Sequence, residues 1–309
     1  MALRIFTIHR VGPTQDCYGP AYCERGLVTP YPVLVQMLEQ MRGCGEVVSF
    51  QDAFSRGMDC WIDQDLVCIT FDDGFREHRE VVLPLLESLG TRATFFISSA
   101  YHSEEPLVRP LDYLYYLQNA VAESGRGTNW FLDVLATTTG FERAPGVSAA
   151  SHLRGKTWGD VGTSLEAVGR ELGVRVSAEE LRDKLYLTEA DLRRIALSGM
   201  EIGAHGESHR SLGDLTVSEQ QREIASSLNF ARLVTQRSDV PFAYPFGGEA
   251  SFSDDTVNLC CELGALCACT SREGSNGQQS DRYRLARVDV NRTRMDQQGS
   301  IIIYGNSKA

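Results

Sequence analysis

Apolar residues follow two periods along the chain. Short runs that are apolar at nearly every position, such as residues 67–71, are typical of strands in a parallel sheet covered on both faces. Segments with apolar positions three and four residues apart, such as 32–42, are typical of helices that pack by one face. The expected strands are residues 3–8, 47–50, 67–71, 93–97, 200–204, 241–244, 265–270 and 285–290, and the expected helices are 32–42, 81–88, 188–198, 218–236 and 254–263.

This alternation of strands and helices predicts an α/β fold. Seven or eight such steps in one chain indicate a distorted (β/α)7-type barrel of parallel strands, formed by a single domain over residues 1–309. In barrels of this kind the catalytic residues lie at the carboxyl ends of the strands.

The alternation is interrupted between residues 101 and 187. Helical patterns at 111–123 and 178–185 predict a mainly helical insertion. Its aromatic side chains would suit a lid that stacks on sugar rings, or else the insertion's own core. They are Tyr113, Tyr115, Tyr116, Trp130, Phe131 and Trp158.

The overall charge narrows the possible partners. With 41 acidic and 30 basic residues, the net charge of −11 would repel a phosphate backbone, so no nucleic acid partner is expected. Neither a secretion signal nor an apolar run of membrane-spanning length is visible, so we expect a cytoplasmic protein without an integral membrane segment. Nothing in the sequence indicates the oligomeric state.

Two neighbouring carboxylates follow the strand at 67–71. Asp72 and Asp73 stand directly before Gly74, where a glycine lets the chain turn sharply. They are therefore expected at the carboxyl end of a strand. A plain turn or a helix cap would account for the same three residues.

Two histidines follow the strand at 200–204. His205 and His209 are four residues apart, so a helical turn would put both imidazoles on one face, within reach of one ion. The alternative is a pair of ordinary polar loop residues.

Considered together, the two clusters are expected at the same rim, because both follow parallel strands. Two histidines and one aspartate would leave coordination positions free, which indicates a catalytic rather than a structural ion. A divalent metal ion is expected, zinc first, although such a set also admits Fe(II), Co(II) or Mn(II).

Three ordered motifs resemble the polysaccharide deacetylase family, whose shared domain is also called the NodB homology domain or carbohydrate esterase family 4. The motifs are Ile-Thr-Phe-Asp-Asp-Gly at 69–74, Ala-Thr-Phe-Phe at 93–96, and the segment 201–209 that ends with the second histidine. The resemblance covers about two thirds of the chain, up to Ser99 and again from Thr188 to about Val290.

Residue by residue, the resemblance implies that Asp73, His205 and His209 bind the metal and that Asp72 is the general base. This assignment suits amide hydrolysis, because a divalent ion acidifies a water molecule and polarises a carbonyl while a nearby carboxylate takes the proton.

Residues 242–247, Phe-Ala-Tyr-Pro-Phe-Gly, resemble a further family motif. The resemblance implies that Tyr244, Pro245 and Phe246 line the substrate side, with the backbone N–H of Phe246 near the oxyanion. Where the family often has an arginine two residues before the proline, this chain has Ala243. Arg287, which we also place on the substrate side, could supply the missing charge to Asp72; an exposed or structural arginine is the alternative.

The family's late histidine, its general acid, has no counterpart, because no histidine follows His209. His9, at the end of the first strand, is our candidate for protonating the leaving amine, with an ordinary loop histidine as the alternative. His78, His102 and His152 lie in polar contexts and are expected on the surface.

The sequence therefore predicts metal-dependent hydrolysis of an amide. The expected reaction is N-deacetylation of an N-acetylated sugar or of a small molecule that contains one. One alternative is a hydrolase of other non-peptide C–N bonds, on a cyclic amide or a formyl group. Another is a catalytically impaired carbohydrate-binding relative, although a pure binding site would not need Asp72 as a base.

Overall fold

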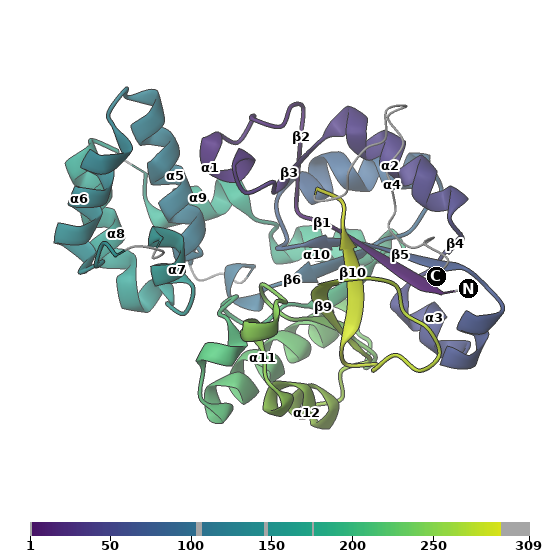
Figure 1. The fold of residues 1–309 in the computed structure, drawn as a ribbon. Helices are drawn as coiled ribbons and strands as arrows, with labels where there is room; N and C mark the ends of the chain where they lie inside the picture. The colour runs from purple at the N-terminus through teal and green to yellow at the C-terminus, as the bar shows by residue number, and fades with distance from the viewer. Residues whose placement is uncertain (1, 103–106, 145–147, 175, 292–309) are drawn as a thin grey trace.

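The computed structural model describes residues 2–102, 107–144, 148–174 and 176–291, and its centre is a closed barrel (Figure 1). The strands are hydrogen-bonded in the order β1-β10-β9-β8-β7-β6-β5, and β1 pairs again with β5, which closes a ring of seven parallel strands. The predicted (β/α)7-type barrel is thus confirmed. The ring consists of β1 (Leu3–Ile8), β5 (Leu66–Asp72), β6 (Thr94–Ile97), β7 (Glu201–Ala204), β8 (Phe242–Ala243), β9 (Ala268–Glu273) and β10 (Leu285–Asp289), with β4 (Glu46–Val47) beside β5.

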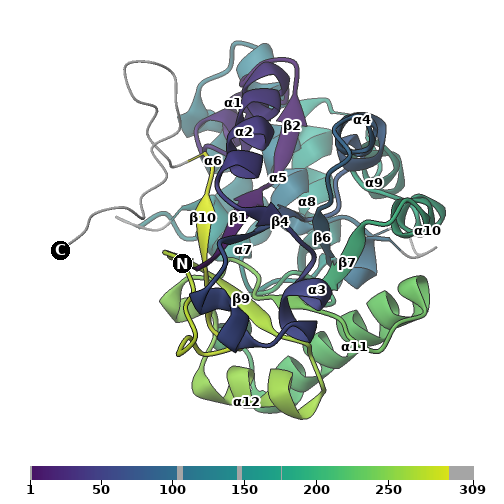
Figure 2. The same ribbon diagram turned by 90° about the vertical axis from the view of Figure 1, so that its right-hand side faces the viewer.

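Helices cover the outside of the ring. In Figures 1 and 2, α2 and α4 lie on one side of the barrel and α11 and α12 on the opposite side. These four helices occur where the sequence predicts them, within two residues at either end. The surrounding helices are α2 (Tyr31–Gly43), α3 (Phe50–Ser55), α4 (Leu83–Ser88, preceded by a π-helical turn at His78–Val82), α10 (Glu189–Leu197), α11 (Val217–Thr235) and α12 (Asp254–Glu262).

The strand β5 is buried on both of its faces along its whole length. In β5, Leu66 and Cys68 belong to a cluster inside the barrel, whereas Val67, Ile69 and Phe71 pack against the outer helices. Because side chains alternate along a strand, the residues in step with Leu66 and Cys68 also face the interior. Asp72 is in step with them, so a charged group stands at the carboxyl end of the barrel lumen.

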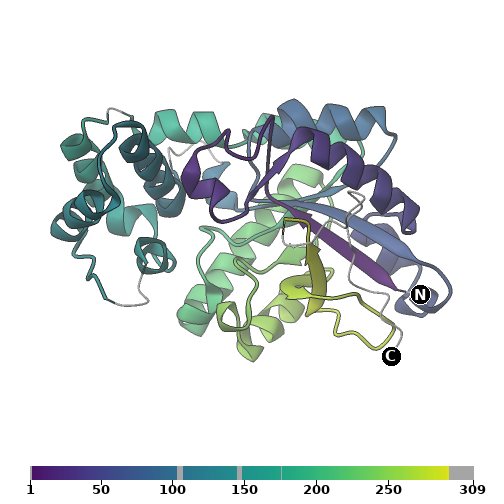
Figure 3. The ribbon, with the colours of Figure 1, turned by 45° about the horizontal axis from the view of Figure 1, so that its top comes forward.

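A helical insertion leaves the carboxyl end of β6. It lies to one side of the barrel (Figure 3) and has its own apolar core, shared with the short helix α1 (Pro20–Cys23). Tyr113, Tyr115 and Phe131 are buried in this core. The insertion contains α5 (Pro110–Glu123), α6 (Thr128–Thr139), α7 (Ala149–Leu153), α8 (Trp158–Leu172) and α9 (Ala178–Leu185).

Some local expectations were wrong. Residues 47–50 do not form one strand: β4 ends at Val47, and the Ser49 hydroxyl accepts a hydrogen bond from the Asp52 N–H at 3.0 Å, which starts α3 at Phe50. A small parallel ladder of β2 (Arg10–Gly12) and β3 (Val28–Pro30) was not predicted, because its strands are only three residues long.

In the described part of the chain, every helix is too short or too polar to span a bilayer.

Candidate active site

A cavity of about 380 Å³ lies at the carboxyl ends of the strands. The barrel contributes interior-facing side chains from five strand ends, and the insertion closes the other side with residues from α5 and α7. The barrel residues that line the cavity include Thr7, His9, Asp72, His205, Ser271 and Arg287.

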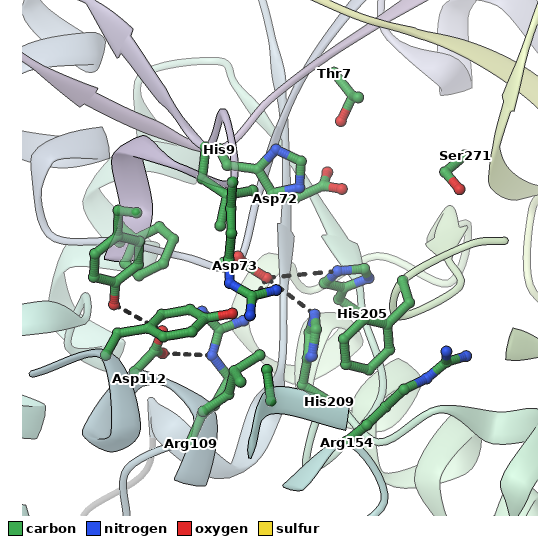
Figure 4. A pocket seen from close by; sticks show the side chains of 18 of the residues that line it. Thr7, His9, Asp72, Asp73, Arg109, Asp112, Arg154, His205, His209 and Ser271 are labelled. Atoms are coloured by element: carbon green, nitrogen blue, oxygen red, sulfur yellow. Dashed lines mark hydrogen bonds and ion pairs between the residues drawn. The ribbon is translucent and has the colours of Figure 1, made fainter. Parts of the chain in front are cut away.

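Three predicted ligands converge in this cavity. The Oδ1 atom of Asp73 lies 3.2 Å from Nε2 of His209 and 3.7 Å from Nε2 of His205. All three ligand atoms lie within 4.8 Å of one another, and no other such group occurs among the described residues. Figure 4 shows the two rings and the carboxylate turned toward one point. Residues more than 130 positions apart are therefore placed where one cation could contact all of them.

The loops that carry these ligands are not helical. Asp73, with φ 78°, and Gly74, with φ 68°, both take the left-handed conformation, which turns Asp73 out of line with β5. His209 also has a positive φ of 55°, and Gly206 between the two histidines has φ 75°. The expectation of a helical turn at 205–209 was therefore wrong. A left-handed backbone at non-glycine residues is costly and is often found at functional sites.

Hydrogen bonds orient the histidine loop. His205 Nδ1 donates to the Ala243 carbonyl at 2.7 Å, which leaves Nε2 directed toward Asp73. Burial lowers the pKa of His205 to about 4, so the ring is neutral, as a metal ligand must be. Glu223 of α11 accepts from the Ser208 N–H at 2.8 Å and pairs with Arg210, holding the loop from outside.

Asp72 is paired with Arg287 of β10. Arg287 Nη1 lies 2.9 Å from one carboxylate oxygen of Asp72 and 2.8 Å from the other, and both side chains are buried. Burial alone would raise the pKa of Asp72, but the positive charge of Arg287 is the largest of the nearby influences that together lower it. The carboxylate is thus ionised next to the three candidate ligands.

Asp73 has a partner that the sequence did not reveal. Arg109, the residue before α5, places Nη1 2.6 Å from Asp73 Oδ1. Burial would raise the pKa of Asp73, but Arg109 and His209 hold it well below its usual value. The only sequence signal for Arg109 is a charged residue in the otherwise apolar segment 107–111.

The donor set fits a divalent cation. Asp73 Oδ1 is buried and accepts no hydrogen bond, since the contact with Arg109 is an ion pair without hydrogen-bond alignment. One carboxylate oxygen and two imidazole nitrogens are ligands that zinc and related ions accept.

His9 lines the cavity, and its Nδ1 is buried without a hydrogen-bond partner. The carbonyl of His9 accepts from Nε2 of His78 at 2.7 Å, which fixes the turn between β1 and β2. His78 and His102 are both buried, so the expectation that they lie on the surface was wrong. His78 packs among Phe71, Phe75 and Phe95, a tertiary environment that the surrounding polar residues did not indicate.

The model of the polysaccharide deacetylase family matches residues 62–125 and 144–267, more than half of the chain. The chain belongs to the polysaccharide deacetylase family. The matched segments contain Asp72, Asp73, His205 and His209, together with most of the insertion.

The match to a single sequence relative covers less of the chain than the family model does. A Bacillus subtilis (strain 168) protein named as a candidate polysaccharide deacetylase, YxkH, is 25% identical over 126 residues. That match covers 41% of this chain and 44% of the relative, so the chain matches less than half the length of that protein.

Solved structures share the fold over nearly the whole chain. The Streptococcus pyogenes deacetylase PplD, solved with acetate, has a TM-score of 0.57 at 15% identity and covers 94% of this chain and 92% of its own. The de-N-acetylase of Aggregatibacter actinomycetemcomitans has a TM-score of 0.58 at 12% identity, covering 95% and 97%. IcaB from Ammonifex degensii has a TM-score of 0.55 at 15% identity, covering 94% and 91%.

In this protein the segment 242–247 lies beside the triad of Asp73, His205 and His209. Phe246, with φ 63°, has its ring 4.9 Å from that of His209 and borders the cavity. Tyr244 borders it too, but its hydroxyl donates to the Tyr283 carbonyl and its ring stacks on Phe252 in the core. Pro245 is not among the described residues that line the cavity.

Arg154 of the insertion is a second residue that the sequence did not reveal. Its guanidinium lies 4.9 Å from the centre of the Phe246 ring and donates to the hydroxyls of Ser211 and Ser251. It therefore ties α7 to two loops of the barrel rim. Like Arg109, it comes from a segment without a recognisable motif.

Proposed function

We propose that this protein removes the acyl group from an N-acylated sugar with the help of a divalent cation, zinc being the first candidate. The observation that carries the proposal is the convergence of Asp73, His205 and His209 within 4.8 Å, with the ionised Asp72 next to them. Membership of the polysaccharide deacetylase family supports the same reaction.

Asp73 Oδ1, His205 Nε2 and His209 Nε2 would hold the cation. When bound, it supplies Lewis-acid polarisation of the substrate carbonyl and lowers the pKa of water. The protein's own contribution is to keep the His205 ring neutral and the Asp73 carboxylate ionised, so that neither of these two ligands has to lose a proton first.

Asp72 would accept the proton of the attacking water. The water oxygen bonds to the amide carbon, its proton passes to a carboxylate oxygen of Asp72, and Arg287 keeps that carboxylate ionised beforehand. The backbone N–H of Phe246 is the candidate donor to the developing oxyanion.

His9 would supply the proton that lets the amine leave. When the carbon–nitrogen bond breaks, the nitrogen takes a proton from His9, and the products are the carboxylic acid and the free amine. The position of His9 in the cavity and its unpartnered Nδ1 support this role.

The cavity suggests how the substrate is presented. A volume of about 380 Å³ lies at the small end of the range for small-molecule sites, which is about 300–1,000 Å³. Aromatic residues Tyr22, Phe75 and Tyr115 line it from the insertion side. We therefore propose a single sugar unit, free or at the end of a larger conjugate, as the group that enters.

The test is acetate release from a panel of N-acetyl sugars, sugar nucleotides and short N-acetylglucosamine oligomers. Asp72→Asn should retain zinc but lose activity by about a thousandfold or more, because a general base contributes on the order of 10²–10⁴. His205→Ala should lose both zinc and activity. Acetate release that persists in Asp72→Asn, or a protein that releases none from any substrate while fully loaded with metal, would contradict the proposal.

A further inference from the structure

Two kinds of partner, imidazole rings and a guanidinium, meet at one oxygen of Asp73. Oδ1 is the atom directed toward both imidazoles, at 3.2 Å from His209 Nε2, and it is also the atom that Arg109 Nη1 approaches to 2.6 Å. Figure 4 shows the guanidinium of Arg109 on the insertion side of the carboxylate and the two histidines on the barrel side. A cation bound by the triad would therefore share its carboxylate ligand with a buried arginine.

Arg109 is held firmly in this position. Its Nε donates to Asp112 Oδ2 at 2.6 Å, and its backbone N–H donates to the Tyr186 hydroxyl at 3.2 Å. Asp112 in turn accepts from the hydroxyls of Tyr22, at 2.8 Å, and Tyr186. The guanidinium also lies over the Phe75 ring at 5.2 Å. With this many partners, Arg109 has no ready alternative position when an ion binds.

The Asp73 loop is attached to the insertion at a second place. The Arg76 N–H donates to the Leu185 carbonyl at 2.8 Å, and the Leu187 N–H donates to the Gly74 carbonyl at 3.0 Å. The carboxyl-terminal end of the insertion thus holds the segment that follows Asp73. Arg109 and Asp73 are therefore fixed to each other rather than brought together by chance rotamers.

We propose that Arg109 is a positioning residue that shares Asp73 Oδ1 with the catalytic cation and weakens the hold of the site on that cation. This inference rests on the proposed function, because it assumes that the triad binds a metal. The physical reason is that two positive groups on one carboxylate oxygen repel each other and divide its electron density. Asp112, on the far side of the guanidinium, offsets part of that repulsion.

The consequence is a site that exchanges its ion more readily but leaves more positive charge available to a substrate carbonyl. It also makes the insertion, rather than the barrel, responsible for how tightly the metal is bound. A barrel of this family without this arginine would be expected to hold its ion more tightly.

The test measures zinc affinity by competition with a chromophoric chelator at pH 7.5 in the absence of substrate. The double variant Arg109→Gln/Asp112→Asn removes both charges but keeps hydrogen-bonding groups, and its affinity should rise by about tenfold. Asp112→Asn alone leaves Arg109 without its counter-charge, and its affinity should fall by about tenfold. Arg109→Lys keeps the charge and should stay within about threefold of the unmodified protein.

A matched control is the buried pair of Arg10 and Glu77, at 2.7 Å, whose guanidinium packs on the same Phe75 ring. Arg10→Gln/Glu77→Gln should leave zinc affinity unchanged, with thermal unfolding confirming that all variants are folded. Equal or weaker zinc binding by the Arg109→Gln/Asp112→Asn variant overturns the inference. So does unchanged binding by Asp112→Asn, which keeps the test decisive if the double variant fails to fold. Because no substrate is present, an absence of deacetylation would count against the proposed function and not against this role of Arg109.

Discussion

Asp72 and Asp73 are neighbours in sequence, yet they belong to different regions of the molecule. Asp72 continues the inward-facing side of β5, and its partner Arg287 comes from another barrel strand. Asp73 turns out of the strand, and its partner Arg109 comes from the helical insertion. Each carboxylate is buried beside an arginine, but only Asp73 forms a possible metal site with His205 and His209.

The barrel and the insertion therefore contribute different groups to the site. In the proposed reaction the barrel supplies the groups that transfer protons, because Asp72, Arg287 and His9 all stand at or next to the ends of strands that hydrogen bonding holds in register. The insertion, with its separate apolar core, contributes Arg109 beside Asp73 and one wall of the cavity. If this division is correct, barrel variants should change the chemistry, and insertion variants should change metal affinity or the attachment of the insertion.

After Asp72→Asn, the largest effect is expected for His9→Ala on the barrel side. Loss of the general acid should lower kcat by about a hundredfold or more, because such groups contribute on the order of 10²–10⁴. Metal content should not change, since His9 is not part of the ligand triad. Steady-state kinetics with metal analysis of the same samples checks this. A parallel loss of metal would show that His9 affects metal binding and would contradict its assignment as the general acid.

A smaller effect is expected for Arg287→Gln. The charge of Arg287 lowers the pKa of Asp72, so its removal should raise that pKa. The reaction needs ionised Asp72, and the acidic limb of the kcat/KM profile should therefore move to higher pH. We expect about a tenfold loss of kcat at neutral pH and a larger loss in acid.

The control for that variant is Arg287→Lys, which keeps the charge and should restore most of the original profile. A uniform loss at all pH values, with the acidic limb unmoved, would mean that Arg287 acts only through its contacts with Thr7 and Thr270.

The last prediction concerns stability rather than activity, through the attachment of the insertion. His102, at the start of the connection, contacts the Leu187 carbonyl at its end at 2.8 Å, and burial lowers its pKa to about 4. A lowered folded-state pKa gives stability that is present above the unfolded value of about 6.5 and is lost as pH falls toward 4. Between pH 7 and pH 5, His102 should cost the metal-free protein about 2 kcal/mol.

Urea unfolding of metal-free protein at both pH values measures this loss. His102→Gln can keep a hydrogen bond to Leu187, and its free energy of unfolding should decrease less between pH 7 and pH 5. Some decrease remains in this variant, because the pKa of His205 is also lowered to about 4. An identical decrease in the variant would contradict the assignment to His102.

Much of the barrel could be predicted from the sequence because burial leaves a direct mark on it. A strand covered on both faces must be apolar throughout, as in β5, and a helix such as α11 must carry one apolar stripe. Carboxylates and imidazoles directly after such strands are placed at one rim by parallel pairing alone. For that reason Asp72, Asp73, His205 and His209 could be found without coordinates.

Only the tertiary structure decided which groups stand next to them. The left-handed turns at Asp73 and His209 depend on neighbouring loops, and the contact between Arg287 and Asp72 depends on closure of the ring between β1, β5 and β10. Arg109 reaches Asp73 from an insertion whose sequence pattern predicts its helices and its core but not its contact with the barrel. Periodicity reports that a face is buried, but it does not report which distant segment covers it, because many partners satisfy the same burial equally well.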